Sequence, residues 1–119
     1  MADERLIAAL DVPTRADAEQ LVTRLGDSVS CYKVGMELFY ALGGNIVTWL
    51  KEREKKVFLD LKLHDIPNTV GNGLCSLLHL APAILNVHTA GGLRMMKAAA
   101  EALHRAAAEA DIPCPKLIG

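Results

Sequence analysis

The chain has 119 residues and a formal net charge of -1, because 13 Lys and Arg nearly balance 14 Asp and Glu. Its composition, 51% hydrophobic and 23% charged, excludes a disordered chain, a collagen-like repeat and a small disulfide-stapled domain. A near-neutral chain lacks the basic surface that nucleic acids and anionic membranes attract, so neither is expected as a partner.

Sequence features at the N-terminus and at the cysteines point to the cytoplasm. Asp3 and Glu4 precede only a short apolar run, unlike the basic start of a secretory signal. No run of 18 apolar residues occurs that could span a membrane. The three cysteines, Cys31, Cys75 and Cys114, show no CxxC spacing and are expected to be packed or incidental thiols. We therefore expect a cytoplasmic protein.

The first elements alternate between strand and helix. A short apolar run at residues 6–10 predicts a strand. Apolar residues then recur at helical spacing, with Thr14 as the expected N-cap and Gly26 just past the end of the helix. A second apolar run, residues 29–34, predicts the next strand, and such runs are typical of strands buried on both faces.

The same alternation continues through the middle of the chain. Residues 36–53 predict a helix that is interrupted at Gly43-Gly44, and residues 57–61 predict a third strand. Pro67 is expected at the first position of the next helix, because its missing N–H costs nothing there.

The last elements complete a regular series. Residues 84–87 and 116–118 predict strands on either side of a helix over about residues 93–110. Strand starts therefore recur about every 27 residues, the size of a strand-plus-helix unit. Four units and the start of a fifth strand predict an α/β protein with parallel strands. Eight units would give roughly 216 residues, the size of a TIM (β/α)8 barrel, so residues 1–119 are expected to form about half of one barrel domain.

Charged residues fall at the C-terminal ends of the predicted strands, where such barrels carry their active sites. Asp11 follows the first strand, Lys33 lies near the end of the second, and Asp60 lies at the end of the third. Asp60 and Lys62 are two residues apart and share one face of a strand expected to be buried. Asp65 follows in the loop. Buried charges need partners or a ligand, so the array is either a site or a structural ion-pair network.

The array favours one type of chemistry. Neighbouring carboxylates would hold Lys62 protonated. A protonated amine is unsuited to forming a Schiff base, but it can stabilise a developing carbanion and then donate a proton. His88, at the end of the fourth predicted strand, is expected to be a hydrogen-bonded core histidine instead.

Four segments resemble one known family, in the right order and spacing along essentially the whole chain. They are LDLKLHDIPNTV at residues 59–70, YKVGMELF at 32–39, ALDV at 9–12 and NVHTAGG at 86–92. Together they are similar to the orotidine 5′-phosphate decarboxylase family. The D-x-K-x-x-D core is shared with sugar-phosphate decarboxylases and synthases of the same superfamily, whereas the H-D-I-P-N-T extension is more particular to the nucleotide enzymes.

This resemblance implies a (β/α)8 barrel that decarboxylates orotidine 5′-monophosphate to UMP in de novo pyrimidine synthesis, with no metal and no organic cofactor. By motif, Lys62 would stabilise and protonate the pyrimidine C6 carbanion. Asp60 would lie beside the departing carboxylate, and Lys33 would link the charges to the ribose. Asp11 matches a substrate-binding residue of the family.

The resemblance also implies partners. Asp65 and Thr69 would reach the neighbouring subunit's site in a homodimer, and Ile66 and Pro67 belong to the same substrate-binding segment. By this resemblance, residues 1–119 are the N-terminal half of a single (β/α)8 barrel domain, and the C-terminal half is absent from this chain. The family's phosphate-binding residues lie in that C-terminal half, so the chain would need it for activity. Two alternatives remain: a sugar-phosphate decarboxylase or synthase of the superfamily, which would use Mg2+, and a non-catalytic half-barrel that self-associates through its open edges.

Overall fold

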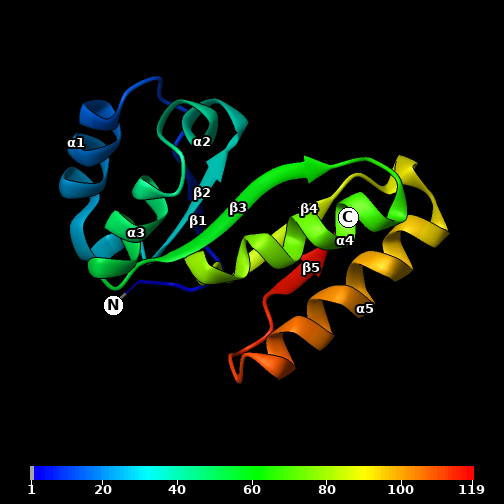
Figure 1. Ribbon diagram of the computed structural model, residues 1–119. Helices are drawn as coiled ribbons and strands as arrows, with labels where there is room; N and C mark the ends of the chain where they lie inside the picture. Colours follow the sequence, from blue (N-terminus) through cyan, green and yellow to red (C-terminus); the bar gives the residue numbers. More distant parts are fainter. Residues whose placement is uncertain (1) are drawn as a thin grey trace. The chain divides into compact units, whose positions relative to one another are not determined.

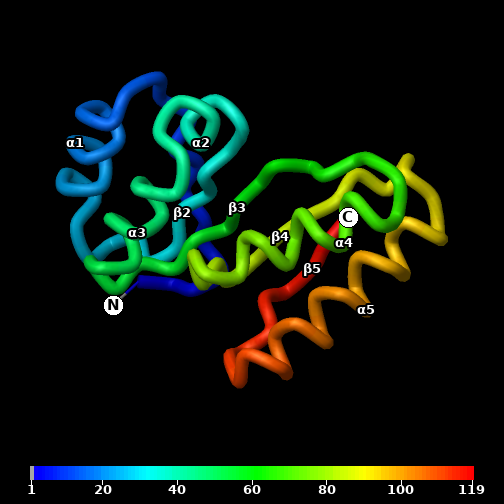
Figure 2. The backbone as a smooth tube through the Cα atoms, in the orientation of Figure 1, coloured from blue at the N-terminus to red at the C-terminus, as the bar shows by residue number. Residues whose placement is uncertain are grey.

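A computed structural model describes residues 2–119, in which five strands alternate with helices (Figure 1). The strand order is β1-β2-β3-β4-β5, and the pairs β1·β2, β2·β3 and β4·β5 are parallel. The fold is α/β, as predicted, with the first four βα units of a TIM barrel and the start of a fifth strand. The chain divides into two compact units, one ending at Asp60 and the other comprising Leu61–Gly119, whose paths Figure 2 traces.

The strands are β1 (Ile7–Ala9), β2 (Cys31–Gly35), β3 (Lys56–Leu63), β4 (Ile84–Val87) and β5 (Lys116–Ile118). The α-helices are α1 (Arg15–Leu25), α2 (Met36–Leu42), α3 (Asn45–Glu52), α4 (Pro67–Ser76) and α5 (Leu93–Glu109). Short 3-10 turns occupy Gly26–Ser28, Leu78–Leu80 and Thr89–Gly91. Across residues 2–119, none of the helices combines the length and the apolar character that a membrane span requires.

The helix boundaries in the first unit follow from capping and from glycine. The Thr14 side chain accepts a hydrogen bond from the Asp17 backbone N–H at 3.1 Å, so α1 begins where the sequence predicts. Gly26 ends it with a φ of +51°, a conformation that costs glycine little. Gly43, with a φ of +67°, ends α2 in the same way and produces the expected break before α3.

The core of the first unit lies between its strands and its helices. Tyr32 and Val34 on β2 are fully buried. The side chains that accompany them in this core are Leu38, Ile46, Val47, Leu50, Val57 and Leu59. Because side chains alternate along a strand, burying Tyr32 and Val34 places Lys33 and Gly35 on the opposite face of β2. The hydrophobic pattern of β2 therefore fixes the direction of its one charged side chain.

In the second unit, α4 and α5 pack closely against each other (Figure 1). A side chain at Gly71 would place its Cβ only 3.1 Å from the Ala102 Cβ and 3.6 Å from the Ala98 carbonyl oxygen, so the small residues allow this approach. The core of the unit is formed by Leu74, Leu85, Met95, Ala99 and Leu103.

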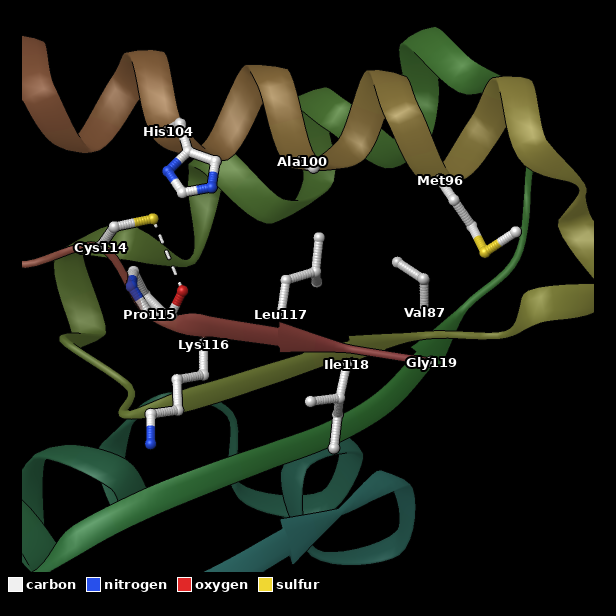
Figure 3. A pocket seen from close by; sticks show the side chains of 10 residues that line it. All are labelled: Val87, Met96, Ala100, His104, Cys114, Pro115, Lys116, Leu117, Ile118 and Gly119. Atoms are coloured by element: carbon white, nitrogen blue, oxygen red, sulfur yellow. Dashed lines mark hydrogen bonds between the residues drawn. The ribbon is translucent and has the colours of Figure 1, made fainter.

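An open cleft of about 430 Å³ lies between α5 and β5 in the second unit (Figure 3). Met96, Ala100 and His104 line it from α5. Leu117 lines it from β5, with Cys114 at the end near His104. The face of α5 and the face of β5 that line the cleft therefore do not fully cover each other.

Strand boundaries differ from the prediction mainly at β3, which extends over Lys56–Leu63 instead of residues 57–61. At its start, the Lys55 ammonium donates to the carbonyl oxygens of Gly26 and Val29, both at 2.8 Å, and the Lys56 N–H donates to the Ser30 carbonyl at 2.8 Å. These bonds add Lys56 to the start of the strand, before the apolar run begins. At the end of the strand, the Lys62 N–H donates to Oδ1 of Asn86 and the Leu63 carbonyl accepts from the His88 N–H, both at 2.9 Å, so the strand also continues beyond residue 61.

Candidate active site

Lys33 lies between two carboxylates in the first unit. Its Nζ is 3.3 Å from Oδ1 of Asp11 and 3.4 Å from Oδ2 of Asp60. The Asp60 side chain is only 8% exposed, that of Lys33 23%, and that of Asp11 68%. The ammonium thus joins a buried carboxylate to one that is open to solvent.

The parallel ladder brings these three residues together. The Leu10 N–H donates to the Lys33 carbonyl at 2.9 Å, which places Asp11 just beyond the last β1 contact with β2. On the other side, Gly35 is the register partner of Asp60. A Cβ at Gly35 would lie 3.3 Å from the Lys33 Nζ, so the missing side chain leaves room for the ammonium.

In the second unit, Lys62 is exposed and has a left-handed backbone with a φ of +52°. Its N–H donates to Oδ1 of Asn86 on β4 at 2.9 Å. The next residue, Leu63, accepts a hydrogen bond through its carbonyl from the His88 N–H, also at 2.9 Å. The expectation that both charges of β3 are buried holds for Asp60 and is wrong for Lys62, which lies near the end of the strand where the backbone leaves regular β geometry.

The segment after β3 forms an exposed loop and the start of α4. Oδ1 of Asp65 accepts a hydrogen bond from the Ile66 N–H at 2.7 Å, and the Ile66 side chain is 64% exposed. Pro67 is the first residue of α4, as predicted, and Thr69 is exposed on its first turn. Asp65, Ile66 and Pro67 line an open cleft together with His64, Ala90 and Gly91.

The prediction that His88 is a core histidine is wrong, because its side chain is exposed. Its ring stacks on His64 with 5.3 Å between centroids and 16° between planes. Its Nδ1 accepts a hydrogen bond from the Ala90 N–H at 3.2 Å, which ties the start of the following turn to the end of β4. The polar ends of β3 and β4 therefore contact each other through side chains as well as backbone.

The remaining titratable and metal-binding groups add little to the site. Burial raises the pKa of the Cys31 thiol, an effect that the nearby charge of Lys56 partly opposes, so Cys31 is a packed thiol as predicted. Among residues 2–119, no group of three or more His, Cys, Asp and Glu side chains is placed to hold a metal ion.

The structure thus brings together three of the predicted residues, Asp11, Lys33 and Asp60, in the first unit. The others belong to the second unit: Lys62, Asp65, Ile66, Pro67 and Thr69. Sequence reasoning did not select Asn86 or His64. Asn86 is the one polar residue within the apolar strand β4. A polar residue inside such a strand needs a hydrogen-bond partner, and this was the sequence signal that could have singled out Asn86.

Comparison with known proteins identifies the family. The family model for the orotidine 5'-phosphate decarboxylase / HUMPS family matches residues 4–117. The chain belongs to this family. Among curated relatives, an orotidine 5'-phosphate decarboxylase of Moorella thermoacetica is 47% identical over 117 residues, which cover 98% of this chain and 46% of the relative. One of Enterococcus faecalis is 54% identical over 101 residues, which cover 84% of this chain and 43% of the relative.

Solved structures agree with this family assignment. The crystal structure of orotidine 5'-phosphate decarboxylase from Lactobacillus acidophilus matches with a TM-score of 0.83 and 42% identity, covering 97% of this chain and 51% of that one. An uncharacterized conserved protein from Geobacillus kaustophilus matches with a TM-score of 0.85 and 45% identity, covering 94% of this chain and 52% of that one. The chain spans about half the length of these relatives.

Proposed function

We propose that the complete protein to which this chain contributes decarboxylates orotidine 5′-monophosphate to UMP, a step of pyrimidine biosynthesis. The observation that carries the proposal is the Asp11–Lys33–Asp60 ion-pair cluster at the strand ends, followed by Lys62 and Asp65 in the D-x-K-x-x-D motif of a chain that belongs to this decarboxylase family. The names of the curated relatives support the same reaction.

The proposed reaction needs an acid but no nucleophile. The bond between pyrimidine C6 and its carboxylate breaks, CO2 leaves, and the electron pair stays on C6. The Lys62 ammonium stabilises this carbanion by its charge and then transfers a proton to C6, and solvent reprotonates the amine. Lys62 is exposed in this chain, which supports a role in which its ammonium contacts a ligand.

Asp60 and Lys33 have separate roles in this proposal. Asp60 lies beside the departing carboxylate of the substrate. The buried negative charge of Asp60 would repel that carboxylate and so favour its loss as CO2. Lys33 forms an ion pair with Asp60 and links the charges to the ribose, and Asp11 contacts the substrate from the end of β1. The pairing of Lys33 with both carboxylates supports this division.

The proposal includes two further contributions to the site. Exposed apolar residues mark β1 (Ile7, 38% exposed) and β5 (Ile118, 45%), which supports a requirement for the remaining strands of the barrel. Those strands would supply the phosphate-binding residues.

The exposed loop with Asp65 and Ile66, together with Thr69 on α4, supports a homodimer in which this segment enters the partner's site. Free cysteines support a cytoplasmic location.

The direct test is a decarboxylation assay of the complete protein with orotidine 5′-monophosphate, in the presence and absence of a strong chelator. The proposal predicts UMP formation at the same rate in both. The alternative, a Mg2+-dependent sugar-phosphate decarboxylase or synthase, shares the D-x-K-x-x-D motif and the family name. That alternative predicts turnover of a substrate such as 3-keto-L-gulonate 6-phosphate, abolished by the chelator. Absence of both activities, with self-association of the chain in sedimentation, would favour a non-catalytic half-barrel.

A further inference from the structure

The backbone of Lys62 adopts a conformation that lysine avoids. Its φ of +52° lies in the left-handed region, where the Cβ of an L-residue crowds the following carbonyl oxygen. Such a conformation is strained for a residue with a side chain and persists only where the surrounding structure enforces it. Contacts around Lys62 must therefore stabilise this backbone conformation at the residue that carries the ammonium.

The amide of Asn86 is placed to do so. Its Oδ1 accepts the Lys62 N–H at 2.9 Å, so a side chain takes the position that a backbone carbonyl holds in a regular ladder. Asn86 lies on β4, two residues before His88, whose N–H donates to the Leu63 carbonyl. Strand β4 and the residue that follows it therefore hold two consecutive residues of β3: Asn86 binds Lys62 through its side chain, and His88 binds Leu63 through the backbone.

This arrangement has a directional consequence. In a regular strand the exit direction of each side chain is set by the pleat, whereas a left-handed residue turns its Cα–Cβ bond away from that direction. Without an acceptor at Asn86, the Lys62 N–H would lose its partner and the strained conformation would lose part of its stabilisation. The lysine could then relax toward ordinary strand geometry, and its side chain would point elsewhere.

We propose that Asn86 is a positioning residue for Lys62: its Oδ1 holds the left-handed backbone that aims the ammonium at the reacting carbon. This inference rests on the proposed role of Lys62 in decarboxylation. It predicts a specific kinetic defect, because misdirecting an acid impairs proton transfer and carbanion stabilisation more than substrate binding.

The test compares three variants of the complete protein. Asn86→Ala removes the acceptor, Asn86→Asp keeps an oxygen in the same position, and Asn72→Ala changes an exposed asparagine on α4 as a matched control. The inference predicts that Asn86→Ala lowers kcat at least 10-fold with KM changed less than threefold. Asn86→Asp recovers most of the lost kcat, and Asn72→Ala stays within twofold of the parent.

A second readout does not depend on activity. Hydrogen exchange of the Lys62 backbone amide, followed by NMR, should be at least 10-fold faster in Asn86→Ala and close to the parent in Asn86→Asp. An active parent with an unchanged kcat in Asn86→Ala would overturn the inference, and so would equal defects in the Ala and Asp variants. An inactive parent would instead contradict the proposed function, while faster amide exchange in Asn86→Ala would still support the contact.

Discussion

Lys33 and Asp60 form an ion pair, with 3.4 Å between Nζ and Oδ2, in which the carboxylate is much more deeply buried than the ammonium. The side chain of Asp60 is 8% exposed and that of Lys33 is 23% exposed. Lys33 also has Asp11 as a second partner, 3.3 Å away and open to solvent. The two residues are therefore unequal: losing the lysine removes a counter-charge from a buried carboxylate, whereas losing the carboxylate leaves the lysine paired.

Replacing Lys33 should consequently cost more stability than replacing Asp60. Lys33→Met should lower the free energy of unfolding by about 1–3 kcal/mol, because a buried carboxylate loses one of its ion-pair partners. Asp60→Asn should cost less than about 1 kcal/mol, since it removes the buried charge itself. Urea unfolding followed by the fluorescence of Trp49, which is 8% exposed in the first unit, measures both.

A matched control for this pair is Lys56→Met. It breaks the exposed Lys56–Glu4 pair at 3.0 Å, where the side chains are 55% and 76% exposed. This change should cost less than about 0.5 kcal/mol, as is usual for surface pairs. A loss in Asp60→Asn as large as that in Lys33→Met would contradict the proposed asymmetry. Equal losses in Lys33→Met and Lys56→Met would show that burial of Asp60 does not raise the cost of breaking its pair.

Tyr32 offers a test of the first core. Its side chain is fully buried, and within residues 2–119 its hydroxyl has no hydrogen-bond partner. The same burial raises the pKa of the phenol, so the group stays neutral. Tyr32→Phe removes the unpartnered hydroxyl and should leave the free energy of unfolding unchanged or raise it by up to about 1 kcal/mol. Tyr40→Phe, at a side chain 70% exposed, is the control and should have no effect. A loss above about 1 kcal/mol in Tyr32→Phe would mean that the hydroxyl has a partner in solution.

A shared site can be detected by mixing two inactive variants. If Asp65 serves the partner's site, dimers that combine a Lys62→Ala subunit with an Asp65→Ala subunit contain one intact site. Random reassociation of equal amounts should then restore about a quarter of the parental activity, since half of the dimers are mixed and each has one working site. Activity that stays at the level of the separate variants would place Asp65 in its own subunit's site.

Much of the fold follows from the sequence, because local chemistry decides it. Strands β4 and β5 have their predicted bounds, and Thr14 caps α1 through its own side chain. The glycine pair at Gly43 and Gly44 separates α2 from α3 as expected. For the cap and the glycine break, the deciding interaction lies within a few residues of the sequence position that reveals it. Strands β4 and β5 pair with each other over a long sequence separation, but a short apolar run marks each of them.

The site is less predictable, because its contacts join residues far apart in the chain. The Lys62 N–H finds Asn86, which is 24 positions later, and no periodicity marks that pairing. A positive φ at a lysine contradicts its own conformational preference, so propensity indicates the wrong geometry there. His88 is exposed for a related reason: it follows the last residue of β4 and stacks on His64, a contact that the hydrophobic pattern does not encode.

The central claim is that the Lys62 ammonium protonates C6 of orotidine 5′-monophosphate. The most direct measurement is kcat for decarboxylation by the complete protein with Lys62→Ala, beside Lys97→Ala, which changes an exposed lysine on α5. Lys62→Ala should lower kcat by at least about 10³-fold, because it removes both the acid and the charge that stabilises the carbanion. Its unfolding midpoint should stay near that of the parent, and Lys97→Ala should retain full activity. Full activity in a folded Lys62→Ala protein would contradict the claim.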